Sequence, residues 1–312
     1  MESSRCTTIE DLNKLVISNA LRPLIRFEEA MHEKRFCRIA EAICRKDAVA
    51  VMLSGPSSSG KTTAANRLAT QLRVHGKKPV LMSLDDYYID RDKIAPGPDG
   101  KLDLEHISTI DTELFARNLQ DVLAGETVRI PTFNFKTGRR EWNGHLLHLE
   151  KDSVIIVEGL HALNPVLLPK GLDPGKVFLM FVCPQLPPDY QIPDYLLRLL
   201  RRIVRDYESR GTSVQRTIAM WESVRQGEKR WIFPYQENAD VFFNSAALYE
   251  PAVLKKHISP LLTTVKPEDE TYDYVSAIIN LLNHVEEADV DDEIPPISLV
   301  REFIGGNTFY RQ

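Results

Sequence analysis

One short segment constrains the fold of this 312-residue chain more than any other feature. Residues 55–62 read GPSSSGKT and match the pattern G-x-x-x-x-G-K-[ST] at every fixed position. The run before it, Ala48–Leu53, is wholly apolar, as in a strand buried on both faces of a parallel sheet. A helical pattern follows at Thr62–Val74. A strand, a glycine-rich turn and a helix in this order predict an α/β fold with a loop that wraps around phosphate groups.

Each residue type in this loop has a physical role. Glycines let the backbone curl so that its N–H groups point at phosphate oxygens, and the helix adds the positive end of its dipole. Lys61 supplies a positive charge that we expect to act in catalysis, and the Thr62 hydroxyl is a ligand for Mg²⁺. The motif does not distinguish ATPases, GTPases and kinases. It predicts that ATP with Mg²⁺ is held by Gly55, Ser57, Ser58, Ser59, Gly60, Lys61, Thr62 and Thr63.

Further apolar runs alternate with helical patterns along the chain. Strands that alternate with helices predict crossover connections, and therefore a three-layer P-loop NTPase fold with a mainly parallel central sheet and a helical lid. We divide the chain into a helical extension (1–46), a P-loop domain (47–285) and an acidic linker with a tail (286–312). The runs are Pro79–Leu84, Val154–Val157 and Val177–Val182, and the helical patterns are Arg26–Arg45, Asp111–Leu123 and Tyr195–Tyr207.

Composition excludes several other classes of protein. The formal net charge of −5 gives no overall basic field for nucleic acid or an anionic membrane. The apolar runs are far shorter than a bilayer span, and residues 1–11 lack the apolar segment of a secretory signal. The four cysteines form no CxxC pair, so neither a disulfide scaffold nor a structural zinc site is expected. We expect a cytoplasmic protein that binds neither nucleic acid nor membrane; the sequence is compatible with a homo-oligomer.

Acidic residues follow two of the other predicted strands. Asp85 and Asp86 come after Pro79–Leu84, and Glu158 ends the run that begins at Val154. Ligands of open α/β sheets lie beyond the carboxyl ends of the strands, so these acids should converge on the phosphate loop. We assign Asp85 to deprotonating or positioning an attacking hydroxyl, and Glu158 and Asp85 with Thr62 to Mg²⁺. Asp86 is interpreted as a structural residue that caps the next turn.

Four arginines share one face of the helical pattern that starts near Tyr195. Like charges this close disfavour a helix unless an anion compensates them, which favours a lid that closes on ATP. A solvated face paired with Asp206 and Glu208 is the alternative, and an RNA-binding face is a third, though aromatic residues are not interleaved. We assign Arg201 to ATP binding and Arg202 and Arg205 to catalysis. The face comprises Arg198, Arg201, Arg202 and Arg205, and Arg210 follows it.

Taken together, these motifs resemble the uridine kinase/phosphoribulokinase family. The narrower resemblance is to uridine kinase-like nucleoside kinases that microbes often carry behind a synthetase-like domain, which this sequence does not contain. The segments that carry the broad resemblance are the phosphate loop, LDDYY (84–88), PTFNF (131–135), VEGLHAL (157–163) and RLLRRIVRDYESRG (198–211), and those for the narrower one are EEAMHEK (28–34), FPYQENADVFFNSA (233–246) and REFIGG (301–306).

The resemblance implies an acceptor site for a nucleoside. Asp85 would be the base for its 5′-hydroxyl, and Tyr88 would line the same pocket. Glu105 stands where uridine kinases have a ribose-binding Asp, and His106 matches the next residue of the family. The resemblance also places Phe133 where an aromatic ring stacks on the base, and Arg140 at the close of the same loop.

Two departures leave the acceptor open. Uridine kinases read the pyrimidine edge with a His where this chain has Gly138, and an Arg after the lid glycine is replaced by Thr212. Phosphorylation of a nucleoside is our first hypothesis. The alternatives are a kinase of another small alcohol, such as a sugar phosphate or vitamin precursor, and a regulatory nucleotide-binding module without enzymatic activity.

Overall fold

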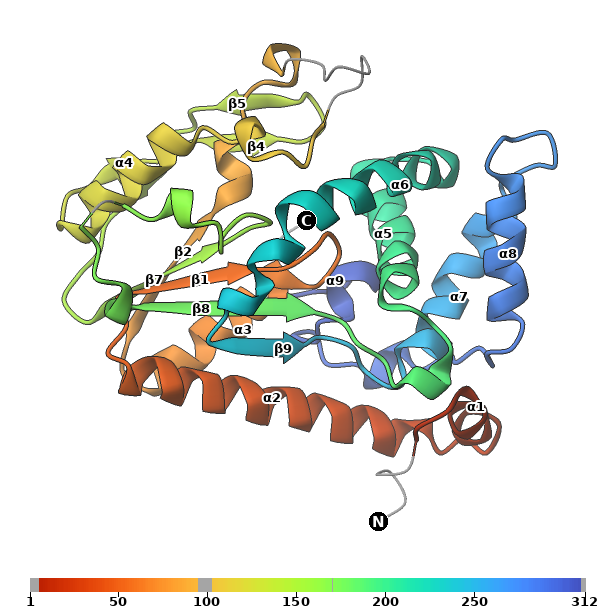
Figure 1. Ribbon diagram of the computed structural model, residues 1–312. Helices are drawn as coiled ribbons and strands as arrows, with labels where there is room; N and C mark the ends of the chain where they lie inside the picture. Colours follow the sequence, from red (N-terminus) through yellow and green to blue (C-terminus); the bar gives the residue numbers. More distant parts are fainter. Residues whose placement is uncertain (1–5, 95–102, 170, 310–312) are drawn as a thin grey trace.

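A five-stranded parallel sheet forms the centre of the protein (Figure 1). The computed structural model describes residues 6–94, 103–169 and 171–309. The strands lie in the order β2-β7-β1-β8-β9, and every neighbouring pair is parallel. This confirms the predicted α/β fold. The strands are β1 (Ala50–Ser54), β2 (Lys78–Ser83), β7 (Ser153–Glu158), β8 (Val177–Cys183) and β9 (Val241–Asn244).

Both faces of this sheet are buried, which explains the wholly apolar strands. In β1, Val51 and Leu53 pack in the core under α2 and α3, whereas Ala50 and Met52 pack on the opposite side with α4. The register pairs both Leu53 and Ser83 with Glu158, so three strands end at one edge of the sheet. The three helices are α2 (Leu21–Arg45), α3 (Lys61–Val74) and α4 (Thr112–Leu123).

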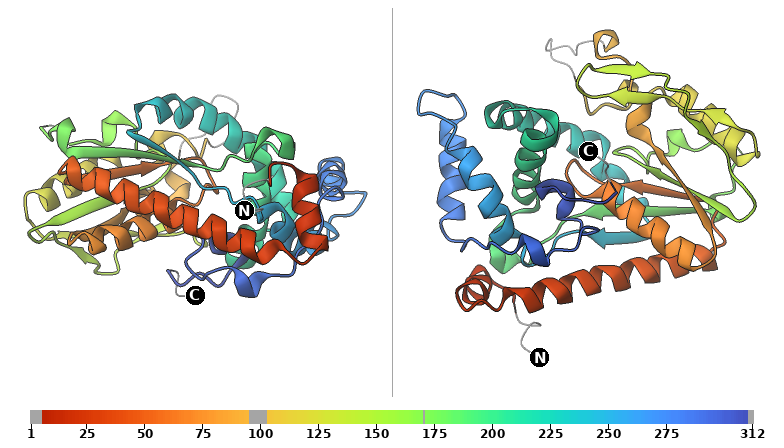
Figure 2. Two further views of the ribbon diagram at one scale, coloured as in Figure 1. Left: turned by 90° about the horizontal axis from the view of Figure 1, so that it is seen from below. Right: turned by 180° about the vertical axis from the view of Figure 1, so that it is seen from behind.

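Helix α2 begins earlier than the sequence pattern predicts. It starts at Leu21 rather than Arg26, because Pro23 lies in its first turn, where a backbone N–H has no helical partner to lose. Seen from below, α2 crosses the whole sheet (Figure 2, left). A shorter helix, α1 (Ile9–Ile17), precedes it and begins with a capping box between Thr8 and Asp11.

The remaining helices gather at the end of the sheet where the strands finish (Figure 1). They share one apolar core with α1 and the start of α2. Two small antiparallel pairs flank α4 and complete the fold. These helices are α5 (Asp194–Arg210), α6 (Val214–Trp231), α7 (Glu250–Leu262), α8 (Tyr272–Leu282) and α9 (Arg301–Ile304), and the pairs join β3 (Val128–Arg129) to β6 (Leu146–Leu147) and β4 (Thr132–Asn134) to β5 (Arg139–Glu141).

The acidic segment 286–293, expected as a linker, is fastened to the body of the protein. Arg22 donates to Asp292 at 2.8 and 2.9 Å, and Arg26 donates to Glu293 at 2.6 Å. Asp291 accepts from Lys256 at 2.9 Å. The domain limits at 46 and 285 stay a prediction. Within the described part of the chain, no helix combines the length and the apolar character needed to span a bilayer.

Candidate active site

The phosphate loop joins β1 to α3, as the sequence predicts. Gly55 passes so close to β8 that a Cβ there would lie 2.0 Å from the carbonyl oxygen of Val182. Gly60 caps α3 with φ of 88°, a left-handed conformation that glycine adopts without strain. Lys61 then starts the helix, so the free N–H groups of the first turn face the loop.

Two buried ion pairs hold this loop from behind. Arg198 donates to both oxygens of Glu228 at 2.8 and 2.9 Å, and the same carboxylate accepts the N–H of Ser57 at 2.7 Å. Arg201 pairs with Glu250 at 2.5 and 2.7 Å and donates to the carbonyl of Ser58 at 3.3 Å. These contacts fix the loop in the curled form that binds phosphate.

The segment 298–307 packs against the start of α3 (Figure 2, right). Glu302 accepts the N–H of Thr63 at 3.1 Å, and the amide of Asn307 donates to the Thr63 hydroxyl at 3.1 Å. Leu299 lies 3.1 Å from the point where a Cβ on Gly60 would be. The Glu302 carboxylate therefore accepts a hydrogen bond from an N–H group at the positive end of α3, where the helix dipole favours an anion.

Two carboxylates meet in front of the loop. Glu158 accepts from the Ser83 hydroxyl at 2.8 Å and from the Thr62 hydroxyl at 3.4 Å. Burial, and next the negative charge of Asp85, raise the pKa of Glu158 to about 7, although the charge of Lys61 lowers it. The site thus holds more negative charge than its surroundings compensate. A hydroxyl and carboxylate oxygens are the ligands that Mg²⁺ prefers, so Thr62, Glu158 and Asp85 fit this ion.

Three arginines of α5 face the same space and share one acid. Arg202, Arg205 and Arg210 lie 3.2, 2.7 and 3.6 Å from the carboxylate of Asp206. The neighbouring charge of Arg205, and then burial, lower the pKa of Arg210 to about 10. One carboxylate against three guanidinium groups leaves an excess of positive charge, which suits a polyphosphate.

A chamber with aromatic walls opens beside Asp85. Tyr88, Phe133 and Phe135 contact one another, with the two phenylalanine rings 5.2 Å apart and nearly perpendicular. The guanidinium of Arg210 lies 4.9 Å from the centre of the Phe135 ring. Phe135 belongs to the PTFNF segment (131–135), in which the resemblance gives a role to Phe133 alone.

Glu105 faces the same cavity. Burial raises its pKa to about 7, and among the described residues its Oε2 has no hydrogen-bond partner. Gly227 lets α6 pack directly on this residue, because a Cβ there would lie 2.4 Å from the Cβ of Glu105. An unpaired buried carboxylate oxygen in a cavity suits a ligand hydroxyl.

All these groups line one cavity of about 860 Å³. Of the residues assigned from the sequence, it brings together the loop from Ser57 to Thr62 with Asp85, Tyr88, Glu105, Phe133, Glu158, Arg202 and Arg205. The lining also includes residues that sequence reasoning did not assign, namely Arg91, Phe135, Glu302 and Asn307. The sequence signal for Glu302 was the resemblance of the segment REFIGG (301–306) to uridine kinase-like nucleoside kinases.

Five assigned residues do not line this cavity in the described part of the chain, and one of them is Gly55, which packs against β8. Arg201 and Thr63 contact the loop and the segment 298–307, as described above. His106 packs edge-on against Trp231 at 4.4 Å. Arg140 donates to Asp111 at 2.9 Å and to the carbonyl oxygens of residues 87 and 88, so it ties β5 to the segment that carries Asp85.

Asp86 does not cap the next turn, as we expected, because the side chain of Ser83 fills that position. Asp86 instead accepts the N–H of Phe133 at 3.2 Å and thereby fixes the aromatic strand β4 beside the cavity. Burial is the main reason that its pKa rises to about 6. The next residue, Tyr87, is fully buried and accepts from Asn118 at 3.1 Å.

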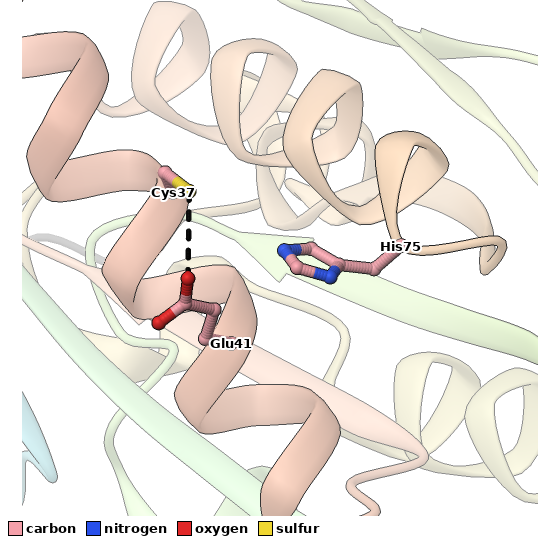
Figure 3. Close-up of side chains that lie close together, drawn as sticks. All are labelled: Cys37, Glu41 and His75. Atoms are coloured by element: carbon pink, nitrogen blue, oxygen red, sulfur yellow. Dashed lines mark hydrogen bonds between the residues drawn. The ribbon is translucent and has the colours of Figure 1, made fainter.

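A separate cluster of side chains that can bind metals lies between α2 and the end of α3 (Figure 3). Cys37 donates to Glu41 at 3.7 Å, and His75 lies beside them, with the three ligand atoms within 4.8 Å of one another. His75 caps the C-terminal end of α3, a 14-residue helix that starts at the phosphate loop, which places the cluster roughly 20 Å from that loop. It takes no part in the site described above.

The fold and the loop define a P-loop nucleotide-binding protein, and the acids and arginines around its cavity are those of a kinase. The phosphoribulokinase/uridine kinase family model matches residues 50–249. The chain belongs to this family.

Curated relatives and a solved structure agree with this assignment. The chain is 32% identical over 190 residues to a uridine kinase of Macrococcus caseolyticus, covering 61% of this chain and 84% of that one. It is 31% identical over 194 residues to a uridine kinase of Ligilactobacillus salivarius, covering 62% and 83%. The structure of a candidate fructose transport system kinase from Silicibacter sp. TM1040 superposes with a TM-score of 0.51 at 20% identity, covering 67% and 98%, and supports the fold alone.

Proposed function

We propose that this protein transfers the terminal phosphate of ATP to the 5′-hydroxyl of a nucleoside. The observation that carries the proposal is the single cavity that joins the phosphate loop to Asp85 and to the aromatic chamber. A polyphosphate at the loop and a planar base stacked on Phe133 would place the hydroxyl of the acceptor between them, next to Asp85. The uridine kinases among the relatives are consistent with this acceptor class.

Each group has a task in this scheme. Asp85 accepts the proton of the attacking hydroxyl, and Glu105 accepts hydrogen bonds from the sugar. Lys61, Arg202 and Arg205 stabilise charge on the transferred phosphoryl group. Thr62, Glu158 and Asp85 would hold Mg²⁺, which would neutralise phosphate charge. The ion pairs of Arg198 and Arg201 keep the loop N–H groups aimed at the phosphates.

The experiment is an acceptor panel. The purified protein is incubated with Mg·ATP and either ribonucleosides, deoxyribonucleosides, sugar phosphates or vitamin alcohols, and the products are identified by mass spectrometry. We expect a nucleoside 5′-monophosphate from at least one nucleoside. Phosphorylation of a non-nucleoside alone would replace the proposed acceptor class, and ATP turnover without any phosphorylated acceptor would favour a regulatory module.

Asp85→Asn is the matched variant for this panel, because it keeps the shape of the side chain and removes the base. Asp189→Asn, the same change at an exposed residue that does not line the cavity, serves as the control. Loss of product in the first variant but not in the second supports the assignment of Asp85.

A further inference from the structure

Arg91 lines the cavity at the aromatic chamber, and it lies directly next to Gly138. Gly138 lies between β4 and β5 with φ of 70°. A Cβ on this glycine would lie 2.7 Å from Cδ and 3.0 Å from Cγ of Arg91. The stem of Arg91 therefore crosses directly over Gly138, in the space that a larger residue at position 138 would need.

The backbone under Arg91 is fixed at several points. Its N–H donates to the carbonyl of Gly138 at 2.9 Å. The preceding residue, Asp90, accepts the N–H of Arg140 at 2.9 Å, and the following one, Asp92, pairs with Arg139 at 3.2 Å. The side chain thus projects from a fixed position, and it lines the cavity together with Tyr88, Phe133 and Phe135.

We infer that Arg91 reads the edge of the nucleoside base and determines which base is accepted. This inference rests on the proposed nucleoside kinase activity. A guanidinium group carries only donors, arranged as a fork that matches two neighbouring acceptors. Guanine presents such a pair at O6 and N7, and cytosine presents one at O2 and N3, whereas adenine and uracil alternate donors with acceptors along their edges.

The inference predicts an order of acceptors. A bidentate contact between arginine and a base contributes about 1–3 kcal/mol of discrimination, which corresponds to roughly fivefold to 150-fold. Cytidine should therefore exceed uridine in kcat/KM by about tenfold, and guanosine should exceed adenosine by a similar factor. Stacking on the phenylalanine rings tolerates every base and does not produce this order.

The test compares kcat/KM for cytidine, uridine, guanosine and adenosine in the wild type and in Arg91→Met. Methionine keeps the apolar stem and removes the donors. We expect both ratios to fall to within about threefold of one, mainly through KM for the favoured base. Arg139→Met is the control, because Arg139 is exposed, pairs with the same segment and does not line the cavity.

Gly138→Ala gives an independent perturbation, because its methyl group would displace the Arg91 stem. This variant should lower the same ratios in the wild type and leave them unchanged in an Arg91→Ala background. The ratios do not depend on the fraction of folded enzyme.

The outcomes separate the two proposals. If the wild type phosphorylates no nucleoside, the proposed function fails and the role of Arg91 fails with it. If nucleosides are phosphorylated but Arg91→Met keeps the wild-type ratios, or the wild type prefers uridine and adenosine, only the inference about Arg91 is overturned.

Discussion

Replacing Arg201 by methionine should destabilise the fold, and with it the phosphate loop that Arg201 holds. Both Arg201 and its partner Glu250 have no exposed side-chain surface. The guanidinium also donates to the carbonyl oxygens of Ser245 at 2.9 Å and Ser58 at 3.3 Å. The variant leaves a buried carboxylate without a positive partner, and such a loss costs about 3–5 kcal/mol of unfolding free energy.

Urea and thermal unfolding, followed by circular dichroism, measure this loss. A change of this size lowers the melting temperature on the order of 10 °C in a protein of a few hundred residues. Arg202→Met is the matched comparison from the next position of the helix. Because Asp206 keeps Arg205 and Arg210 as partners, no buried carboxylate is left unpaired, and this second variant should lose clearly less than Arg201→Met. Its defect should appear in phosphoryl transfer.

A double variant separates the ion pair from other effects of Arg201. Glu250→Gln removes the charge of the partner and keeps an acceptor for the N–H of Ala247. Arg201→Met with Glu250→Gln should recover more than half of the lost stability, because no unpaired charge stays buried. Equal losses in Arg201→Met and Arg202→Met, or a loss below about 1 kcal/mol in the former, would refute the division of the arginine face into buried and active members.

Three further changes test the site. Asp85→Asn should cut phosphoryl transfer at least about 100-fold with ATP affinity nearly unchanged by calorimetry, and wild-type turnover would contradict its role. Glu302→Gln should tighten Mg·ATP binding roughly fivefold, since a carboxylate no longer competes for the N–H of Thr63, whereas Glu208→Gln, on the same cavity wall, should change it less. The pKa of the Glu105 carboxyl is raised to about 7, and this group must be ionised to accept two sugar hydroxyls. KM for the acceptor should therefore rise as pH falls below 7, and Glu105→Gln should remove this pH dependence.

The strands and the phosphate loop could be predicted because their signals are local. A wholly apolar run must be buried on both faces, and glycine and lysine at fixed spacing define the turn that follows it. Asp85 and Glu158 could be placed near the loop for the same reason, since the ends of parallel strands share one edge of the sheet. The structure brings both into the cavity with Lys61.

The arginine face could not be resolved in the same way. Helical spacing puts Arg198, Arg201, Arg202 and Arg205 on one side of α5, but this side is wide enough to contact both the protein interior and the cavity. Arg198 pairs with Glu228, 30 residues further along the chain, and Arg201 pairs with Glu250, 49 residues further along. Spacing within one helix carries no information about such partners.

The acidic segment 286–293, expected as a linker, makes contacts that the local sequence does not reveal. Its acidic composition resembles a solvated linker, yet Asp292 finds its partner Arg22 some 270 residues away. Glu302 contacts Thr63 across 239 residues of sequence. Charge runs indicate exposure only when no distant segment of opposite charge packs on them, and the sequence does not show which segments meet.

The geometry of the phosphate loop depends on residues beyond the part of the chain that matches the family model. The match ends at residue 249, whereas the carboxylate that neutralises Arg201 belongs to Glu250. Glu302, which occupies the N–H of Thr63, lies further still beyond the match. Ser58, whose carbonyl Arg201 holds, has a left-handed φ of 59°, which a residue other than glycine keeps only when its surroundings impose it. Contacts from beyond the matched segment therefore add to those of Arg198 and Glu228 within it in holding the phosphate loop.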